Sequence, residues 1–375
     1  MSPRSFLCLM AVLLTVACAS PVRATERARS PERQAVEKAL VFLMEDANQW
    51  KKEHRCISCH QGTMTIWALS EAKGQGFSVR TDQLSEMNHS VFGETGALVK
   101  AGIISDPQKP ADPQPGYNIV SLSTFNLAMA SRFVPSLDTV SRQELDLMAR
   151  DIVKHQEADG SWSGLPPGNG PPPVFESTEV MTLRSMLALE TYQPTAPSLS
   201  ASFRACLEKA SRWLQQNKST DTTQTAALRL LVDAQAGKRG KDLVSGIKDL
   251  LKRQHPDGGW GPTQELPSDA YASGMALYAL SLAGVRNNSA QIVRARTFLI
   301  TNQRPDGSWL MIPRAHPGQA PFKNPSPIIY FGSSWAMLGL LRSLPKEVHN
   351  TSLALLPSAA RPQPIPPIIE ITLPK

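Results

Sequence analysis

Two kinds of helical pattern alternate along most of the chain. In stretches such as 241–254, apolar residues recur at helical spacing between polar positions. After a loop, each is followed by a stretch that is apolar or small on every side, such as 271–282. The first kind predicts an amphipathic helix with one solvated face, and the second predicts a helix that is buried all round.

This alternation occurs six times between residues 31 and 346. The amphipathic stretches are 33–50, 81–103, 138–155, 200–217, 241–254 and 289–303. The apolar stretches are centred near Trp67, Phe125, Leu183, Leu228, Leu277 and Met337. Six pairs of an outer and an inner helix close naturally into a double ring. We therefore expect an all-α protein with one domain over 31–346, an α6/α6 toroid.

Three copies of one short motif follow the amphipathic stretches. They have the pattern Q-x-x-D-G-[SG]-W and occupy 156–162, 254–260 and 303–309. The Asp-Gly pair predicts the end of a helix, because glycine readily takes the left-handed conformation. The last two tryptophans are 49 residues apart and the first two are 98 apart, which is twice that spacing. The spacing indicates a stacked array, with a degenerate copy between Gln216 and Thr222.

These segments resemble the QW repeats of squalene–hopene cyclases and their relatives, over nearly the whole mature chain. The resemblance implies an α6/α6 toroid in which the Gln and Trp of each repeat staple one hairpin to the next. The chain also has a C-x-x-C-H string at 56–60. In this it is more similar to the secreted bacterial toroid proteins that carry such a string in their first repeat.

The resemblance also defines where a cyclase would hold its acid. Triterpene cyclases of this type protonate an alkene with the middle Asp of a D-x-D-D-T-A motif. The nearest string here is 221–226, in which Thr223 and Gln224 stand at the two critical acids. A hydroxyl cannot serve as such a strong donor, so classical cyclase activity is not expected. The zinc site of the related protein prenyltransferases is not evident either, because Cys206 lies on an outer helix.

The string Cys56-Ile57-Ser58-Cys59-His60 points to different chemistry. It reads C-x-x-C-H, the attachment pattern of c-type haem, in which two thiols bind the porphyrin and the histidine binds iron. It lies between the first outer and the first inner helix, at the mouth of the expected ring. We therefore predict one covalent haem c, held by Cys56 and Cys59, with His60 as the proximal iron ligand. A Cys56–Cys59 disulfide, a redox dithiol and half of a zinc site are the alternatives.

The sixth iron ligand is not determined by the pattern. His316 and Met311 follow the third motif, on a loop expected at the mouth, and His316 is the favoured candidate. His54 and His89 are further candidates. An open sixth position is equally consistent; it would favour small-molecule chemistry, whereas a closed one would favour electron transfer.

Three acidic residues open inner helices: Glu176, Glu179 and Asp269. Acids at helix N-termini stabilise the helix dipole and cap free N–H groups, and this interpretation is favoured. The alternative is a catalytic role in proton transfer within the cavity, where burial would raise a carboxyl pKa.

Both ends of the chain predict segments outside the ring. Arg4, an apolar run over 6–17 and the small residues that follow predict a secretory signal peptide over 1–24. A lipoprotein anchor at Cys18 is disfavoured, because Thr15 stands where a Leu-like residue is usual. The tail over 347–375 is rich in proline and is expected to be extended or disordered. A periplasmic or secreted location follows.

The formal charge of +7 is mildly basic. There is no Lys/Arg-rich run with interleaved aromatics, so nucleic acid is not an expected partner. No stretch after the signal is long enough to span a membrane, although membrane association stays open. The expected function is electron transfer or redox chemistry, with a redox partner protein or a small hydrophobic ligand. A cyclase-like enzyme acting on an isoprenoid lipid and a non-catalytic binding scaffold are the alternatives.

Overall fold

The computed structural model describes residues 30–54, 61–92, 99, 117–133, 139–163, 177–192, 194, 197–217, 222–311 and 326–344. The chain divides into two compact units, Met1–Ser30 and Pro31–Lys375. All helices described below belong to the second unit. The signal peptide over 1–24 and the tail over 347–375 lie outside the described residues and stay predictions.

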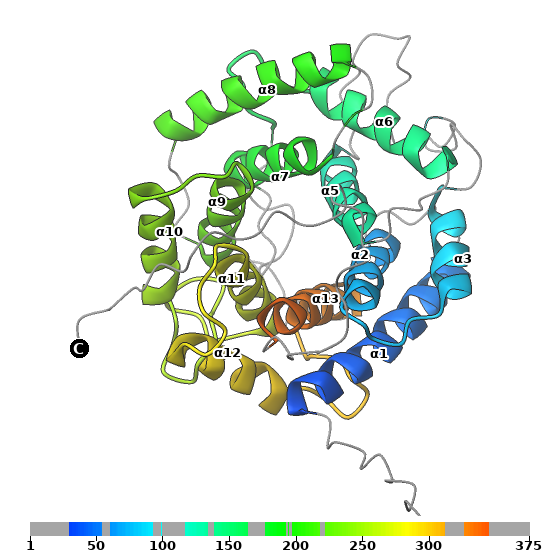
Figure 1. Ribbon diagram of the computed structural model, residues 1–375, viewed down its shortest axis with the longest axis vertical. Helices are drawn as coiled ribbons and strands as arrows, with labels where there is room; N and C mark the ends of the chain where they lie inside the picture. Colours follow the sequence, from blue (N-terminus) through cyan, green and yellow to red (C-terminus); the bar gives the residue numbers. More distant parts are fainter. Residues whose placement is uncertain are drawn as a thin grey trace, which may run out of the picture. The chain divides into compact units, whose positions relative to one another are not determined.

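Twelve helices are described in the second unit, and they form two concentric rings (Figure 1). The outer ring holds α1 (Pro31–His54), α3 (Thr81–Phe92), α6 (Thr139–Lys154), α8 (Pro197–Gln216), α10 (Lys241–Lys252) and α12 (Ala290–Thr301). The inner ring holds α2 (Gln61–Gly74), α5 (Tyr117–Phe133), α7 (Thr178–Thr191), α9 (Thr223–Gln235), α11 (Ala270–Leu282) and α13 (Ser326–Ser343). Each inner helix packs against the next, and α13 packs against α2 to close the ring. The predicted all-α fold and α6/α6 toroid are confirmed.

Burial in the two rings follows the two predicted helix types. On α10, Leu243, Ile247 and Leu250 are buried, while Lys241 and Lys252 are exposed. On α11, every residue from its start to the last turn is buried. Inner helices without a solvated face need a cover, and the outer ring supplies it. Among the helices described, none is both long and apolar enough to cross a bilayer.

Each Q-x-x-D-G-[SG]-W motif fastens its hairpin in the same two ways. The Trp indole donates at 2.7 Å to a carbonyl of its own outer helix, ten residues earlier. The Gln side chain donates to a backbone carbonyl of the next outer helix, at 2.8, 2.9 and 2.8 Å for the pairs Gln156–Cys206, Gln254–Gln291 and Gln303–Ala35. The link between hairpins is therefore made by the Gln, while the Trp secures the turn within its own hairpin.

The third motif closes the outer ring. Gln303 follows α12, and its partner Ala35 lies in α1, so this bond joins the last hairpin to the first. Arg296 on α12 adds to the closure by donating to the Ser343 carbonyl at 2.6 Å and by pairing with Glu32 of α1 at 3.4 Å. Polar bonds from α12 and the turn after it to α1 and α13 therefore help to close the ring, in addition to packing.

The middle motif departs from the others at one position. In the first and third copies, the serine before the Trp donates its hydroxyl to the aspartate of its own motif at 2.7 Å. Gly259 replaces that serine in the second copy. Ser268, from the loop before α11, donates to Asp257 at 2.9 Å instead. All three Asp-Gly turns therefore keep a hydroxyl donor to the aspartate.

Candidate functional site

The C-x-x-C-H string lies in the connection between the first outer and the first inner helix. The preceding helix, α1, ends at His54, and α2 begins at Gln61. Cys56, Cys59 and His60 are outside the described residues, so haem attachment stays a prediction. The string therefore belongs to the connection over 55–60, between the end of α1 and the start of α2.

The start of α2 is fixed to α1 directly after the string. Gln61 is 2% exposed and donates through Nε2 to Asp46 Oδ2 on α1 at 2.8 Å. Burial raises the pKa of Asp46, and this hydrogen bond opposes the rise. The residue that follows the string is therefore held by a partly buried hydrogen bond between the two helices.

Aromatic side chains of several inner helices pack together beside the middle of α2. Trp67 is fully buried, and its ring centroid lies 5.2 Å from Phe125, 5.4 Å from Trp335 and 5.5 Å from Tyr278, all in edge-to-face arrangements. These rings come from α5, α13 and α11, and α11 is not a neighbour of α2 in the ring (Figure 1). The cluster therefore joins four consecutive inner helices, α5, α2, α13 and α11, at the level of Trp67.

The candidates for a sixth iron ligand are dispersed. His316 lies outside the described residues, as does the side chain of His54. Met311 is 1% exposed and packs against Gly332 of α13, so it would have to leave the core to bind iron. His89 is exposed on α3. Within the described ranges, no group of three or more His, Cys, Asp or Glu side chains is placed to hold a metal ion.

Asp269 caps an inner helix. Its carboxylate accepts from the backbone N–H of Ala272 at 2.8 Å, at the N-cap of α11. Its own N–H donates to the Trp260 carbonyl at 3.0 Å, which joins the helix start to the second motif. This geometry matches the favoured capping interpretation of the acids that open inner helices. Glu176 lies outside the described residues.

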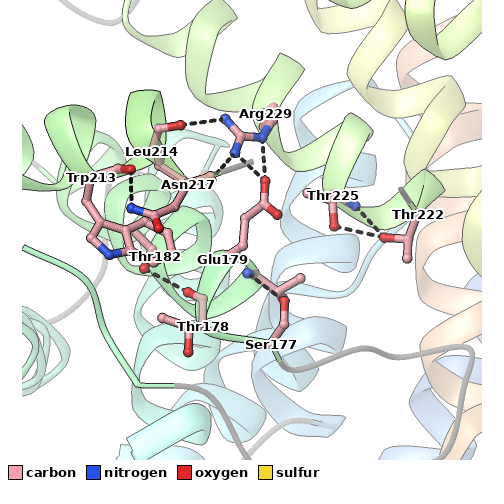
Figure 2. Close-up of polar contacts among 11 residues, drawn as sticks. Ser177, Thr178, Glu179, Thr182, Trp213, Leu214, Asn217, Thr222, Thr225 and Arg229 are labelled. Carbon is pink, nitrogen blue, oxygen red and sulfur yellow. Dashed lines mark hydrogen bonds and ion pairs between the residues drawn. The ribbon is translucent and has the colours of Figure 1, made fainter. Parts of the chain in front are cut away.

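Glu179 lies in the first turn of α7 and is 1% exposed. Figure 2 shows its carboxylate directed at Arg229 of α9, whose Nε donates to it at 2.5 Å. The same guanidinium donates to the Asn217 carbonyl at 3.1 Å and to the Leu214 carbonyl at 3.5 Å, at the end of α8. Glu179 is thus bound to a cation that serves three helices, an arrangement that favours a structural role over proton transfer.

This ion pair stands where the ring lacks a complete motif. The turn between α8 and α9 is the predicted degenerate copy, which has no Asp-Gly-x-Trp. In the intact copies an indole donates to carbonyls of the outer helix. Here the Arg229 guanidinium donates to the carbonyls that end α8, and Glu179 links it to the preceding hairpin. The pair therefore substitutes for the missing staple.

The positions aligned with the cyclase acids form the buried start of α9. Thr222 is the N-cap, and its hydroxyl accepts from the Thr225 N–H at 3.1 Å (Figure 2). Thr223 donates its hydroxyl to the Gly261 carbonyl at 2.6 Å, and Gln224 is 1% exposed. The Thr223 side chain fastens α9 to the loop before α11, and none of the three residues is a carboxylic acid.

A buried carboxylate that was not singled out from the sequence lies at the opposite end of α2. Glu71 is fully buried and accepts from Trp67 Nε1 at 3.0 Å and from the Tyr278 hydroxyl at 3.3 Å. Arg342 Nε of α13 lies 3.4 Å from it as an ion pair. Burial raises the pKa of Glu71, and the Arg342 charge opposes the rise. The visible signal was an acid inside an otherwise apolar inner-helix stretch.

A second missed group lies at the ends of α7 and α9. Burial raises the pKa of Glu190 to about 8; the Asp233 charge adds to the rise, and Lys238 opposes it. Asp233 and Lys238 form an ion pair at 2.6 Å. Because the pKa of Glu190 in the folded protein lies above its ordinary value of 4.5, the folded protein binds the proton more tightly. Stability should therefore fall as pH rises from about 4.5 through about 8.

Glu190→Gln should remove this pH dependence. We expect the variant to match the wild type at pH 5 and to exceed its free energy of unfolding at pH 8.5 by about 2 kcal/mol, because no carboxylate is then buried at high pH. Urea unfolding at the two pH values measures the difference. An equal effect of the substitution at both pH values would contradict the assignment.

Comparisons with known proteins find sequence similarity to cyclases and structural similarity to other proteins of this fold. Residues 198–303 match the family model of the squalene-hopene cyclase N-terminal domain. A squalene–hopene cyclase of Bradyrhizobium diazoefficiens is 32% identical over 89 residues, 24% of this chain and 13% of that protein. A drimenyl diphosphate synthase of Streptomyces showdoensis is 25% identical over 222 residues, 58% of this chain and 32% of that protein. A glycosyl hydrolase of family 88 from Bacteroides vulgatus superposes with a TM-score of 0.51 at 12% identity, over 83% of this chain and 98% of that one.

The fold is terpenoid cyclase-like. The matches span 13% and 32% of the lengths of the two cyclase relatives, so they cover only parts of those enzymes. The likeness to a glycosyl hydrolase concerns the fold alone, and it shows that a ring of this kind also carries unrelated chemistry. The activity of this cyclase-like toroid therefore depends on its own residues and does not follow from the fold.

Proposed function

We propose that this protein is an exported c-type haem protein built on a cyclase-like toroid, which transfers electrons or performs redox chemistry at the mouth of the ring. The C-x-x-C-H string between α1 and α2 carries the proposal. Two thiols and one imidazole at this spacing are the donor set that a covalently attached haem requires. The haem, when bound, supplies an iron centre that changes oxidation state by one electron.

The residues of the chain have separate tasks in this proposal. Cys56 and Cys59 hold the porphyrin through thioethers, and His60 binds the iron. Gln61, tied to Asp46, keeps the chain beside the iron ligand in place, because a fixed ligand helps to tune a metal centre. The aromatic cluster around Trp67 would give the porphyrin apolar side chains to pack against on the inner helices.

The proposed location is the periplasm or the exterior. The apolar run over 6–17, the basic residue before it and the small residues after it support export. The proposed partner is a redox protein that docks near residues 56–60, or a small hydrophobic ligand that reacts there.

Expression of the full chain together with haem-ligation machinery tests the proposal. A coloured protein with a Soret band and one haem per chain is expected. The double variant Cys56→Ala, Cys59→Ala should lose all covalent haem, whereas Cys206→Ala should retain it, because Cys206 is a buried thiol on α8. His60→Ala should retain the thioethers but shift the Soret band. A colourless matured protein, or equal haem content in the double variant, would overturn the proposal.

A cyclase-like enzyme acting on an isoprenoid lipid is the second candidate. The similarity of residues 198–303 to a cyclase domain favours it. So do the buried aromatic rings around Trp67, since such rings attract cations. The substitution of Thr223 and Gln224 for the two acids opposes it. Incubation with squalene should yield no cyclised product, and a cyclic product from the wild type would establish this candidate.

A non-catalytic binding scaffold is the remaining alternative. In that case Cys56 and Cys59 form a disulfide, and the mouth of the ring binds a peptide, glycan or lipid. Thiol titration before and after reduction separates this outcome from haem attachment. A disulfide releases its thiols on reduction, whereas thioethers do not.

A further inference from the structure

Two arginines converge at the end of the inner ring where α2, α5 and α13 finish. Arg132 lies in the last turn of α5 and Arg342 in the last turn of α13, and these two helices flank α2 (Figure 1). Arg342 pairs with Glu71 at 3.4 Å and lies over the rings of Tyr278 and Phe133, with 5.4 and 5.7 Å to their centroids. Its guanidinium is therefore held in one orientation.

Arg132 has no carboxylate partner among the described residues. Its electrostatic neighbours are the hydroxyl of Tyr278 and the charge of Arg342. Partial burial lowers the pKa of Arg132, and the Arg342 charge acts in the same direction, while Tyr278 opposes both. The side chain still contacts solvent. Among the described residues, Glu71 pairs with Arg342 and also accepts from Trp67, while Arg132 lies near the same Tyr278 hydroxyl without a carboxylate of its own.

We infer that Arg132 and Arg342 bind an oxyanion of the phosphate class at this end of the ring. Guanidinium groups present paired N–H donors that match the oxygens of a phosphate. Arg342 donates through Nη2 to the Tyr278 hydroxyl at 3.5 Å, and its Nη1 makes no hydrogen bond to a described residue. The fixed orientation of Arg342 also reduces the entropy lost on binding.

The position of the two arginines at helix ends does not account for this arrangement by itself. A cation in the last turn stabilises the helix dipole, and that explains one basic residue on each helix. It does not explain why both lie near the Tyr278 hydroxyl, where Glu71 pairs with Arg342 alone among the described residues. A bound anion would offset the positive charge of the second arginine. The inference depends neither on haem attachment nor on cyclase activity.

Titration of the full exported chain with inorganic phosphate and with pyrophosphate, followed by calorimetry, tests the site. Wild type should bind at least one of the two anions. Arg132→Gln should bind at least about tenfold more weakly than the wild type, because a charge-assisted bond is lost. Arg204→Gln, at an exposed position on α8, should bind like the wild type. Equal binding in both variants would overturn the inference, and so would a wild type that binds neither these anions nor the phospholipid vesicles described below.

Thermal unfolding provides a second measurement that does not depend on activity. Phosphate should raise the Tm of the wild type and of Arg204→Gln, but should leave that of Arg132→Gln nearly unchanged. A phosphate-induced rise of the same size in Arg132→Gln would contradict the site.

A phosphate group could come from a free anion or from a lipid, and the two sources can be distinguished. Sedimentation with phosphatidylglycerol vesicles, compared with phosphatidylcholine vesicles, reports lipid headgroup binding. If Arg132 is needed for sedimentation, the site takes a lipid headgroup; if the protein binds pyrophosphate but not the vesicles, the site takes a free anion. Both results support a phosphate site, whereas vesicle binding unaffected by Arg132→Gln, without anion binding in solution, would refute it.

Discussion

Replacement of Arg229 by methionine is expected to lower the free energy of unfolding by about 3 kcal/mol. The substitution removes the cation that pairs with Glu179, a carboxylate only 1% exposed. It also removes the donors to the carbonyls of Leu214 and Asn217 at the end of α8. Because a buried carboxylate is costly without its cation, the loss should exceed that of an ordinary surface substitution. Urea unfolding of the full chain measures it.

An exposed ion pair provides the matched control for this prediction. Arg80 and Asp82 pair with side chains that are 68% and 63% exposed, so Arg80→Met should lower the free energy of unfolding far less than Arg229→Met does. The double variant Arg229→Met, Glu179→Gln should recover part of the loss, because no charge then stays buried. If Arg229→Met lowers the free energy of unfolding no more than Arg80→Met does, the Glu179–Arg229 pair does not substitute for the missing motif.

Replacement of Gly307 by alanine is expected to cost about 3 kcal/mol. Gly307 has φ +88°, a conformation that favours glycine, in the turn that closes the ring. A Cβ there would lie 2.6 Å from the carbonyl carbon of Lys38 and would overlap its oxygen. The turn would have to move away from α1 and weaken the bond from Gln303 to Ala35. Thermal and urea unfolding both report this loss.

Gly237 separates the effect of the close contact from the effect of the backbone conformation. It has φ +71°, and a Cβ added there meets nothing within 4 Å. Gly237→Ala should therefore cost about 1 kcal/mol, the conformational cost alone. Equal losses at the two glycines would show that contact with α1 does not contribute to the closure.

The ring could be predicted from the sequence because its signals are local. Six alternations of amphipathic and apolar stretches define the hairpins, and each Asp-Gly pair marks the end of an outer helix. The described bounds agree: α10 covers Lys241–Lys252 within the predicted 241–254, and α12 covers Ala290–Thr301 within 289–303. Periodicity is read within a few turns, so long-range closure is not needed to see it.

The long-range polar partners could not be predicted. Gln303 is a visible motif residue, but only the folded ring shows that it binds Ala35. Glu179 was singled out as an acid at a helix start, yet Arg229, fifty residues later, carries no motif that would pair them. Side-chain bonds across a ring depend on how helices are rotated, and a pattern along one helix does not determine that.

The cluster at Glu71 is an intermediate case. Glu71 and Arg342 are ionisable residues within apolar inner helices, which is a signal in its own right, since a buried charge requires a partner. The sequence does not show that these two residues meet, or that Arg132 approaches them. By contrast, Cys56, Cys59 and His60 were singled out by spacing alone, because the C-x-x-C-H pattern lies within five consecutive residues.

The intact mass of the exported protein, measured after extraction with acid and organic solvent, tests haem attachment most directly. This treatment removes non-covalent haem but leaves thioethers intact. The account predicts the mass of the mature chain plus one haem, with no thiol at Cys56 or Cys59 that can be alkylated. The mass of the mature chain alone, with these cysteines recovered as thiols or as a disulfide, would contradict it.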